Sequence, residues 1–198
     1  MDNDFKVISS SNDVILLRHK KIQTKFRLMF TIKTNGKEVK VSDFLNFSIY
    51  QHLYELNKDL LDDVVVKHDK NDPTSCYVVI LLKKVGNTMG ISEKYLATKV
   101  QLISPNESNC VGLVGTNCSL DIMDIDIPPQ YARLECLESS LFSFYSEGGI
   151  TTQFDFNIED PYFTSRQLQV PRAITDVSAL LLKKAFIRMK EYKASQIH

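Results

Sequence analysis

A stretch of alternating side chains near the N-terminus constrains the fold of this chain more than any other feature. In residues 25–33, the apolar side chains of Phe26, Leu28, Phe30 and Ile32 alternate with Lys25, Arg27, Thr31 and Lys33, apart from Met29. Successive side chains of a β-strand point to opposite faces, so this period of two predicts a strand with one buried face. The pair Asn35 and Gly36 favours a type I′ turn, and Val39 and Val41 then resume the alternation. We therefore expect a β-hairpin here.

Two segments have the spacing of amphipathic helices. In residues 43–61, apolar side chains recur at intervals of three or four, at Leu45, Ile49, Leu53, Leu56 and Leu60. Ser42 precedes this segment and suits a helix N-cap. A second stripe runs through residues 174–193, at Val177, Leu181, Ala185, Met189 and Tyr192. The spacing predicts one long central helix and one C-terminal helix.

The remaining patterned segments predict further strands. Residues 76–85, 94–103, 110–114 and 118–127 have strand character, and a phase slip near Met123 indicates a β-bulge. Residues 141–145 and 150–158 flank a glycine turn and predict a second hairpin, whereas 132–140 favour one or two helical turns. Hairpins and isolated helices, without alternating βαβ units, indicate a β-rich α+β fold. We expect a flexible arm at residues 1–12 and a single domain at 13–198.

Composition limits where the chain works. The longest apolar stretch, Cys76 to Leu82, is far shorter than the roughly 20 residues that a membrane-spanning helix needs. The acidic N-terminus does not resemble a secretory signal, so the four cysteines are expected to be free thiols. These features favour the cytoplasm, which for a viral protein means the host cytoplasm or the virion.

Catalytic and metal-binding patterns are missing from the sequence. The four histidines lack metal-ligand spacing, and Asp121, Asp124 and Asp126 fit the polar face of a strand. Glycine-rich phosphate-binding motifs and the nucleophile motif GxSxG are also absent. We therefore expect no enzyme activity, no metal and no cofactor, with a cysteine-dependent enzyme as the weakest alternative.

A basic group near the first strand is the first candidate site. It consists of Arg18, Lys20, Lys21, Lys25 and Arg27. Lysine and arginine on one face of a strand can contact the phosphates of nucleic acid or of anionic lipids. The alternative is an ordinary polar strand face.

A proline motif in the middle of the chain is the second candidate site. Pro128, Pro129 and Tyr131 match the pattern PPxY, which WW domains bind as an extended polyproline II segment. The alternative is a strand terminator, because proline cannot donate a hydrogen bond to a sheet.

Part of the chain resembles rhabdovirus matrix proteins. Residues 25–63 share their order of strand, turn, strand and long helix opened by Ser-Asp, and the PPxY pattern is common in that family. The resemblance implies a non-enzymatic viral structural protein that self-associates, coats the nucleocapsid RNA and binds anionic membrane. The alternative is a viral accessory protein that binds nucleic acid, of the movement or silencing-suppressor type.

The charge distribution offers a route to self-association. Residues 106–163 carry a net charge of −9, whereas residues 1–105 carry +4 and residues 164–198 carry +5. Basic ends of one molecule can dock on the acidic middle of the next, as a matrix layer requires. The alternative is that these charges pair within one fold.

Overall fold

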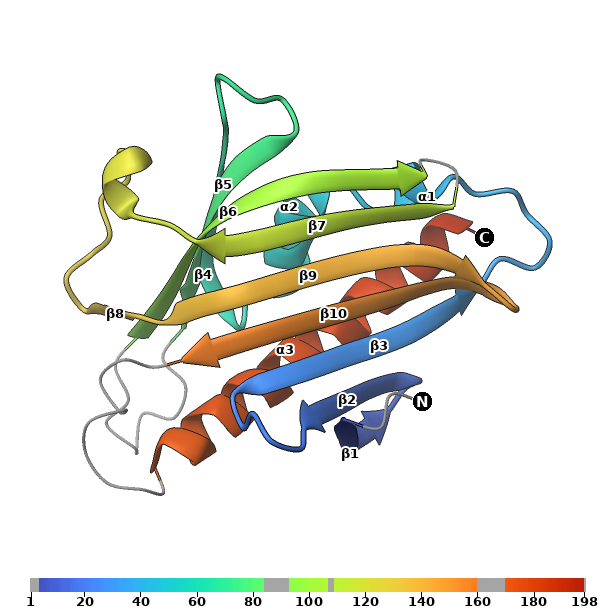
Figure 1. Ribbon diagram of the computed structural model, residues 1–198, viewed down its shortest axis with the longest axis horizontal. Coiled ribbons are helices and arrows are strands. Elements are labelled where there is room, and N and C mark those ends of the chain that lie inside the picture. Colours follow the sequence, from blue (N-terminus) through green and yellow to red (C-terminus); the bar gives the residue numbers. More distant parts are fainter. Residues whose placement is uncertain (1–3, 84–92, 107–108, 160–169, 198) are drawn as a thin grey trace.

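An antiparallel sheet and a long C-terminal helix dominate the structure (Figure 1). The computed structural model describes residues 4–83, 93–106, 109–159 and 170–197. The strands are β1 (Phe5–Ser11), β2 (Val14–His19), β3 (Lys25–Lys33), β4 (Leu61–His68), β5 (Ser75–Leu82), β6 (Glu93–Asn106), β7 (Cys110–Asn117), β8 (Tyr131–Arg133), β9 (Glu135–Ser146) and β10 (Gly149–Glu159). The helices are α1 (Val41–Phe44), α2 (Ser48–Leu56), the short 3-10 helix η1 (Leu120–Ile122) and α3 (Val170–Ile197).

The sheet joins the two ends of the chain. Its strand order is β1-β2-β3-β10-β9-β7-β6-β5-β4, and the short β8 pairs in parallel with β6. Strand β3 pairs with β10 over residues 25–33, although more than 100 residues separate them in the sequence. The prediction of a largely antiparallel α+β fold with a C-terminal helix is confirmed.

The alternation that opened the sequence analysis fixes the inner face of β3. Phe26, Leu28, Phe30 and Ile32 are each less than 5% exposed and belong to the main core. The second predicted hairpin is also present, as β9 and β10 joined through Gly148 and Gly149. Period-two patterns therefore predicted these strands, and for β3 they also predicted the buried face.

The prediction of the first hairpin is wrong for its second strand. Asn35 and Gly36 have the expected positive φ angles of 52° and 79°, but no strand follows them. The reason is that β2 and β10 pair with the two edges of β3, so no edge remains for residues 37–41. The chain continues instead into α1.

The segment predicted to form one long central helix contains two short helices instead. Leu45 is extended, with φ −129°, and only 1% exposed, so it ends α1 by entering the core. After α2, the carbonyl of Asn57 accepts bonds from the backbone amides of Leu60 and Leu61. Strand β4 then begins at Leu61, where the helical spacing of the leucines had predicted a helix.

Three other segments differ from expectation. Residues 118–127 form no strand: they contain η1, and Asp124 has a positive φ of 50°. Residues 132–140 belong to β8 and β9 rather than to helical turns, and the expected N-terminal arm contains β1. Residues 84 and 85 of the expected strand 76–85, and the side chain of Val177, lie outside the described part of the chain.

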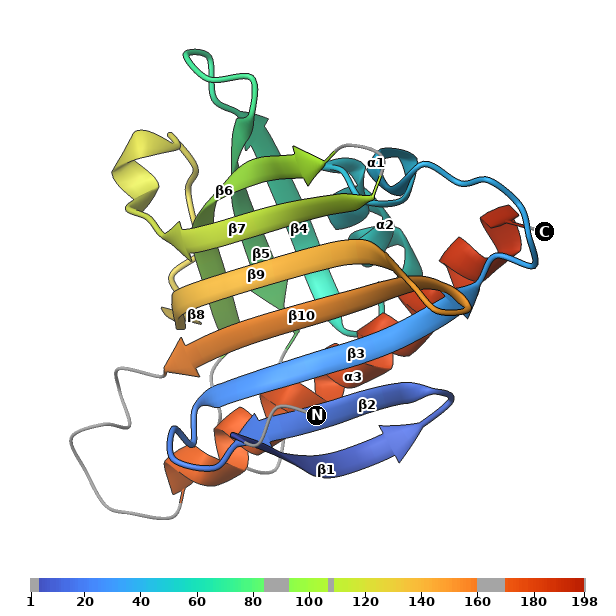
Figure 2. The same ribbon diagram turned by 45° about the vertical axis from the view of Figure 1, so that its right-hand side comes forward.

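The helices cover one face of the sheet. Helix α3 packs against β2 and β3, α2 packs against β4, and the two helices contact each other. In Figures 1 and 2 the sheet curves around them, so the face they cover is concave. The main core lies on this concave face, and a smaller cluster around Val79, Ala97 and Met123 lies on the convex face.

An ion-pair cluster attaches α3 to the segment before β4. Arg188 and Lys184 both donate to Asp59, with Arg188 Nη2 at 2.9 Å and Lys184 Nζ at 3.0 Å from Oδ2. The hydrogen bonds from Arg188, and then those from Lys184, hold the pKa of Asp59 well below its usual range. The stabilisation is therefore complete above the unfolded-state pKa of Asp59, and it is lost as pH falls through the folded-state value.

We expect Asp59→Asn to reduce the acid sensitivity of the fold. The effect should be small compared with core substitutions, because the Asp59 side chain is 49% exposed and solvent screens the pair. The measurement is the difference in unfolding free energy between wild type and variant at pH 7 and below pH 4. An equal difference at both pH values would contradict a stabilising role for the cluster.

Candidate functional site

The concave face is apolar but incompletely filled. Leu96 and Leu102 of β6, Ile80 of β5 and Phe154 of β10 all pack against the main core, yet each keeps accessible surface. These strands have neighbours on both sides, so the surface is not that of a sheet edge. Protein interiors are normally close-packed. Accessible apolar surface on the face that the helices cover therefore indicates that the interior between the sheet and its helices is incompletely packed.

Aromatic rings form one wall of this interior. Phe154 stacks against Phe186 of α3 with ring centroids 5.2 Å apart, and against Phe156 at 4.9 Å. Phe156 in turn stacks on Phe26 of β3 at 5.5 Å. The result is an aromatic row that links two neighbouring strands to the helix.

Several polar groups of the interior are uncharged. Ser143 and Thr152 hydrogen-bond each other across β9 and β10 at 2.9 Å and are buried. Burial raises the pKa of Cys76 to about 12 and of Cys136 to about 11, and it also raises the pKa of the Tyr50 hydroxyl. These thiols and this hydroxyl are protonated at neutral pH, so they add no negative charge.

The structure does not bring the predicted basic group together. Arg18 is 6% exposed on the concave face, where it pairs in register with Phe26. Lys25 forms an ion pair with Glu138, whereas Lys20 and Lys21 are exposed after β2. Arg27 donates to both carboxylate oxygens of Asp155 at 2.7 Å. The five residues therefore occupy two faces and a turn rather than one patch.

The PPxY segment forms a turn. Pro128 and Pro129 are exposed, but the Tyr131 amide donates to the Pro128 carbonyl at 3.0 Å, which closes the segment instead of extending it. The Tyr131 hydroxyl donates to Asp62 at 2.6 Å. Burial, followed by this hydrogen bond, raises the pKa of Tyr131 to about 12. The motif thus precedes β8 as a turn, without the extended shape that WW domains bind.

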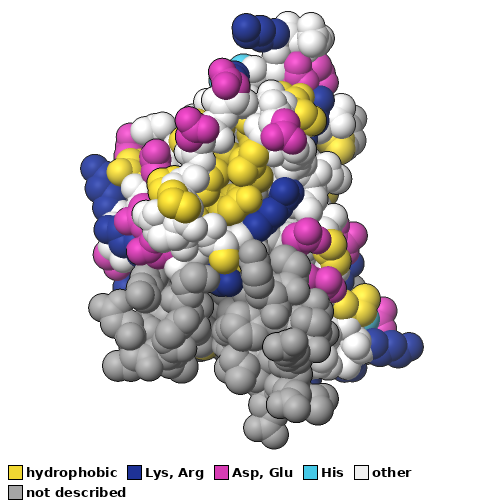
Figure 3. Space-filling view, turned by 90° about the vertical axis from the view of Figure 1, so that its left-hand side faces the viewer, with side chains coloured by type: hydrophobic (Ala, Val, Ile, Leu, Met, Phe, Trp, Pro, Cys, Tyr) yellow, Lys and Arg dark blue, Asp and Glu magenta, His cyan; other side chains and the backbone are white. Residues whose placement is uncertain are grey.

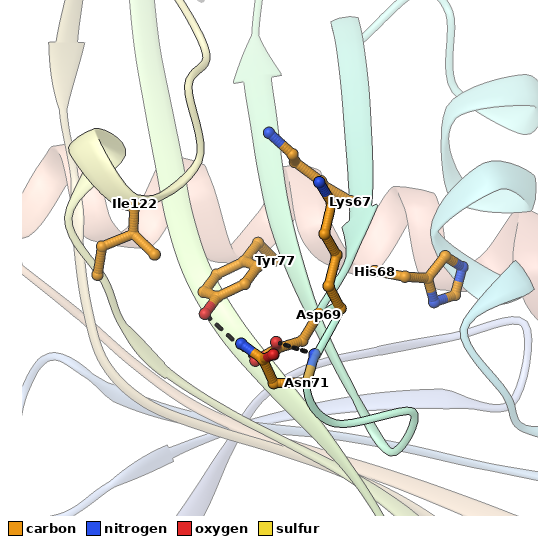
Figure 4. A pocket seen from close by; sticks show the side chains of 7 residues that line it. Lys67, His68, Asp69, Asn71, Tyr77 and Ile122 are labelled. Carbon is orange, nitrogen blue, oxygen red and sulfur yellow. Dashed lines mark hydrogen bonds between the residues drawn. The ribbon is translucent and has the colours of Figure 1, made fainter.

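The convex face has a separate pocket of about 250 Å³, beside the turn after β4 (Figure 4). Ile122 and Tyr77 face each other across it, and His68 points away on the other side of β4. Two of its polar groups pair with other parts of the fold: Asp69 accepts from Lys99 at 2.8 Å, and Lys67 donates to the Met123 carbonyl at 2.6 Å. These bonds connect the turn, β6 and the η1 segment, so the groups act in folding.

Hydrophobic side chains also gather on the surface at this side of the molecule (Figure 3). Ile122 of η1, which lies at this side, is 62% exposed. Beneath the η1 segment, Met123 is buried against Val79 and Ala97. The segment therefore covers β5 and β6 on the convex face. Among the residues that the structure describes, no group of three or more His, Cys, Asp or Glu side chains could hold a metal ion.

Comparison with known proteins identifies the fold. No family model and no curated protein matches the sequence. Solved structures do match. Human StAR-related lipid transfer protein 5 aligns with all of this chain and 89% of its own, with a TM-score of 0.69 and 9% identity. Human STARD10 aligns with 98% of this chain and 74% of its own, with a TM-score of 0.70 and 7% identity.

A bacterial structure gives the same result. The STAR-related lipid transfer protein of Xanthomonas axonopodis aligns with 96% of this chain and 99% of its own, with a TM-score of 0.67 and 5% identity. The chain has the helix-grip fold of these StAR-related lipid transfer proteins. At such low identity the similarity concerns the fold.

The resemblance to rhabdovirus matrix proteins is therefore wrong. The order of strand, turn, strand and long helix on which it rested is not present, and the matching structures span nearly the whole chain. The viral structural function and the nucleic-acid-binding alternative are wrong with it. The expected partners, which were copies of the chain, nucleocapsid RNA, anionic membrane and a WW-domain protein, lose their basis, as does the virion setting. No helix in the described ranges is long and apolar enough to cross a membrane.

Proposed function

We propose that this protein binds a lipid or another hydrophobic small molecule between the concave face of the sheet and its helices. The observation that carries the proposal is the accessible apolar surface that Leu96, Leu102, Ile80 and Phe154 keep on the face that the helices cover. Small-molecule sites are concave, mostly apolar and largely formed before binding. The fold adds support, because the proteins that share it are named for lipid transfer.

The apolar wall of the interior favours a ligand with a large hydrocarbon part. Ser143 and Thr152 satisfy each other, so a ligand that covers them leaves no hydroxyl without a partner. Apolar contact then supplies most of the affinity, at roughly 25 cal/mol for each Å² of apolar surface removed from water. A hydrocarbon chain or a fused-ring skeleton suits such a wall.

We also propose a binding role without catalysis. A cysteine nucleophile needs a lowered pKa, whereas burial raises the pKa of Cys76, Cys118 and Cys136. The expectation of a non-enzymatic protein therefore stays a prediction, supported by the chemistry of these three thiols. Loss of a measured turnover on thiol blocking would contradict it.

Blocking the interior tests the proposed function. Leu102→Trp places a larger side chain on the concave face of β6, and we expect it to weaken binding of a fluorescent fatty acid or a fluorescent sterol at least tenfold. The matched control is Gln101→Trp on the same strand, because Gln101 is exposed and points to the opposite face. Fluorescence titration measures both. Equal binding by the two variants, or no saturable binding of either probe by wild type, would overturn the proposal.

A further inference from the structure

A second pocket lies at the C-terminal end of α3, away from the aromatic row. Its volume is about 270 Å³, and α1, α2 and α3 each contribute to it. Figures 1 and 2 both show the two short helices beside the end of α3. The lining includes Asp43, Phe44, Ser48, His52, Tyr192 and Lys193. This pocket therefore combines an apolar wall with several polar side chains.

Lys193 is the unusual member of this lining. It is only 7% exposed, and its ammonium lies over the ring of Phe44, 5.3 Å from the centroid. Within the described part of the chain, no carboxylate or other acceptor lies within hydrogen-bond distance of its Nζ. Two other lysines of α3 differ: Lys183 donates to Ser9 at 2.8 Å and Lys190 to Asp13 at 2.9 Å.

A buried ammonium without an acceptor is unfavourable. Taking most of a charge out of water is unfavourable unless a counter-ion or hydrogen bonds compensate, and the face of Phe44 compensates only in part. Burial accordingly lowers the pKa of Lys193. An anion that enters the pocket would supply the partner that the ammonium lacks.

The other lining groups indicate which anion fits. Ser48 and Tyr192 carry hydroxyls that can donate hydrogen bonds, and the His52 ring packs against Tyr192 with centroids 4.9 Å apart. Asp43 adds one negative charge to the lining without forming an ion pair with Lys193. The carboxylate of Asp43 repels a doubly charged phosphate more strongly than a singly charged carboxylate, so the lining favours the latter. The apolar surface of Phe44 suits a short hydrocarbon group.

From this arrangement we infer that the pocket at Lys193 binds a small organic acid through its carboxylate. The ammonium of Lys193 binds the carboxylate, the hydroxyls of Ser48 and Tyr192 orient it, and the hydrocarbon part lies on Phe44. This site is distinct from the interior proposed for the hydrophobic ligand.

Titration with butyrate tests the inference. We expect saturable binding to wild type by calorimetry, at least tenfold weaker binding to Lys193→Met, and unchanged binding to Lys184→Met. Lys184 is the matched control because it lies on the same helix but pairs with Asp59 at the surface. Lys193→Met removes a buried charge, so without butyrate it should melt no lower than wild type. Should it fail to fold, Ser48→Phe fills the same pocket from the exposed start of α2.

Separate titrations assign the site and the ligand class. Leu102→Trp should retain butyrate binding, since it blocks only the interior, so the two proposals can fail independently. Butyrate binding that Leu102→Trp abolishes would place the acid in the interior instead. Tighter binding of inorganic phosphate than of butyrate would overturn the carboxylate assignment. Unchanged butyrate affinity in Lys193→Met, or in Ser48→Phe, would overturn the site.

Discussion

Phe26→Ala is expected to lower the free energy of unfolding by about 3–5 kcal/mol, as is typical when a buried aromatic ring is truncated. Phe26 is 1% exposed, stacks on Phe156, and pairs with it in the β3–β10 register. The deleted ring leaves a cavity where the N-terminal strands meet the C-terminal hairpin. Neighbouring side chains cannot fill it without breaking the aromatic row.

Urea unfolding measures this loss. The matched control is Lys33→Ala, on the same strand but exposed, for which we expect a change within about 0.5 kcal/mol. The dependence of the free energy on urea should be the same for both variants if each unfolds in one step. A loss for Phe26→Ala no larger than for Lys33→Ala would show that the inner face of β3 is misassigned.

The sequence predicted those elements whose periodicity is local. The alternation in residues 25–33 and 150–158 predicted β3 and β10, and the three-and-four spacing predicted α3. The prediction from the same spacing is wrong for residues 43–61, because Leu60 continues the helical stripe although the helix already ends at Asn57. Apolar spacing cannot distinguish a helix from a helix followed by a strand when the apolar positions remain in phase.

Local sequence patterns do not predict which strands pair with each other. Asn35 and Gly36 have turn conformations, but whether a hairpin follows depends on whether another strand already occupies the edge of β3. That strand is β10, which begins more than 100 residues later. The register between distant strands depends on how the whole core packs, and the local side-chain pattern of a single sequence does not determine it.

The candidate interior could be predicted only in part. Residues 150–158 were expected to form a strand, but the surface that Phe154 of this strand retains depends on how the helices pack against the sheet. Arg18 shows a missed signal: Val14 and Leu16 share its parity, so extending the alternation by one step places Arg18 on the concave face. Treating Arg18 as part of a surface patch ignored this alternation.

Gly149→Ala is expected to cost about 2–4 kcal/mol of folding free energy, the range for steric and backbone strain at a constrained position. Gly149 has a φ of 155°, and it begins β10 directly opposite Lys33 of β3. A Cβ at this position would lie 2.0 Å from the carbonyl oxygen of Ile32. Because that atom belongs to the backbone of β3, relief of the clash requires the two strands to separate.

Gly36→Ala separates the steric contribution from backbone strain. Gly36 has a φ of 79°, but no atom lies within 4 Å of a Cβ built there. We expect it to lose only about 1–2 kcal/mol, the cost of placing a non-glycine residue in the left-handed region. Urea unfolding of both variants gives the difference. Equal losses would mean that β10 does not approach Ile32 this closely, and the pairing of β10 with β3 beside the proposed ligand site would be wrong.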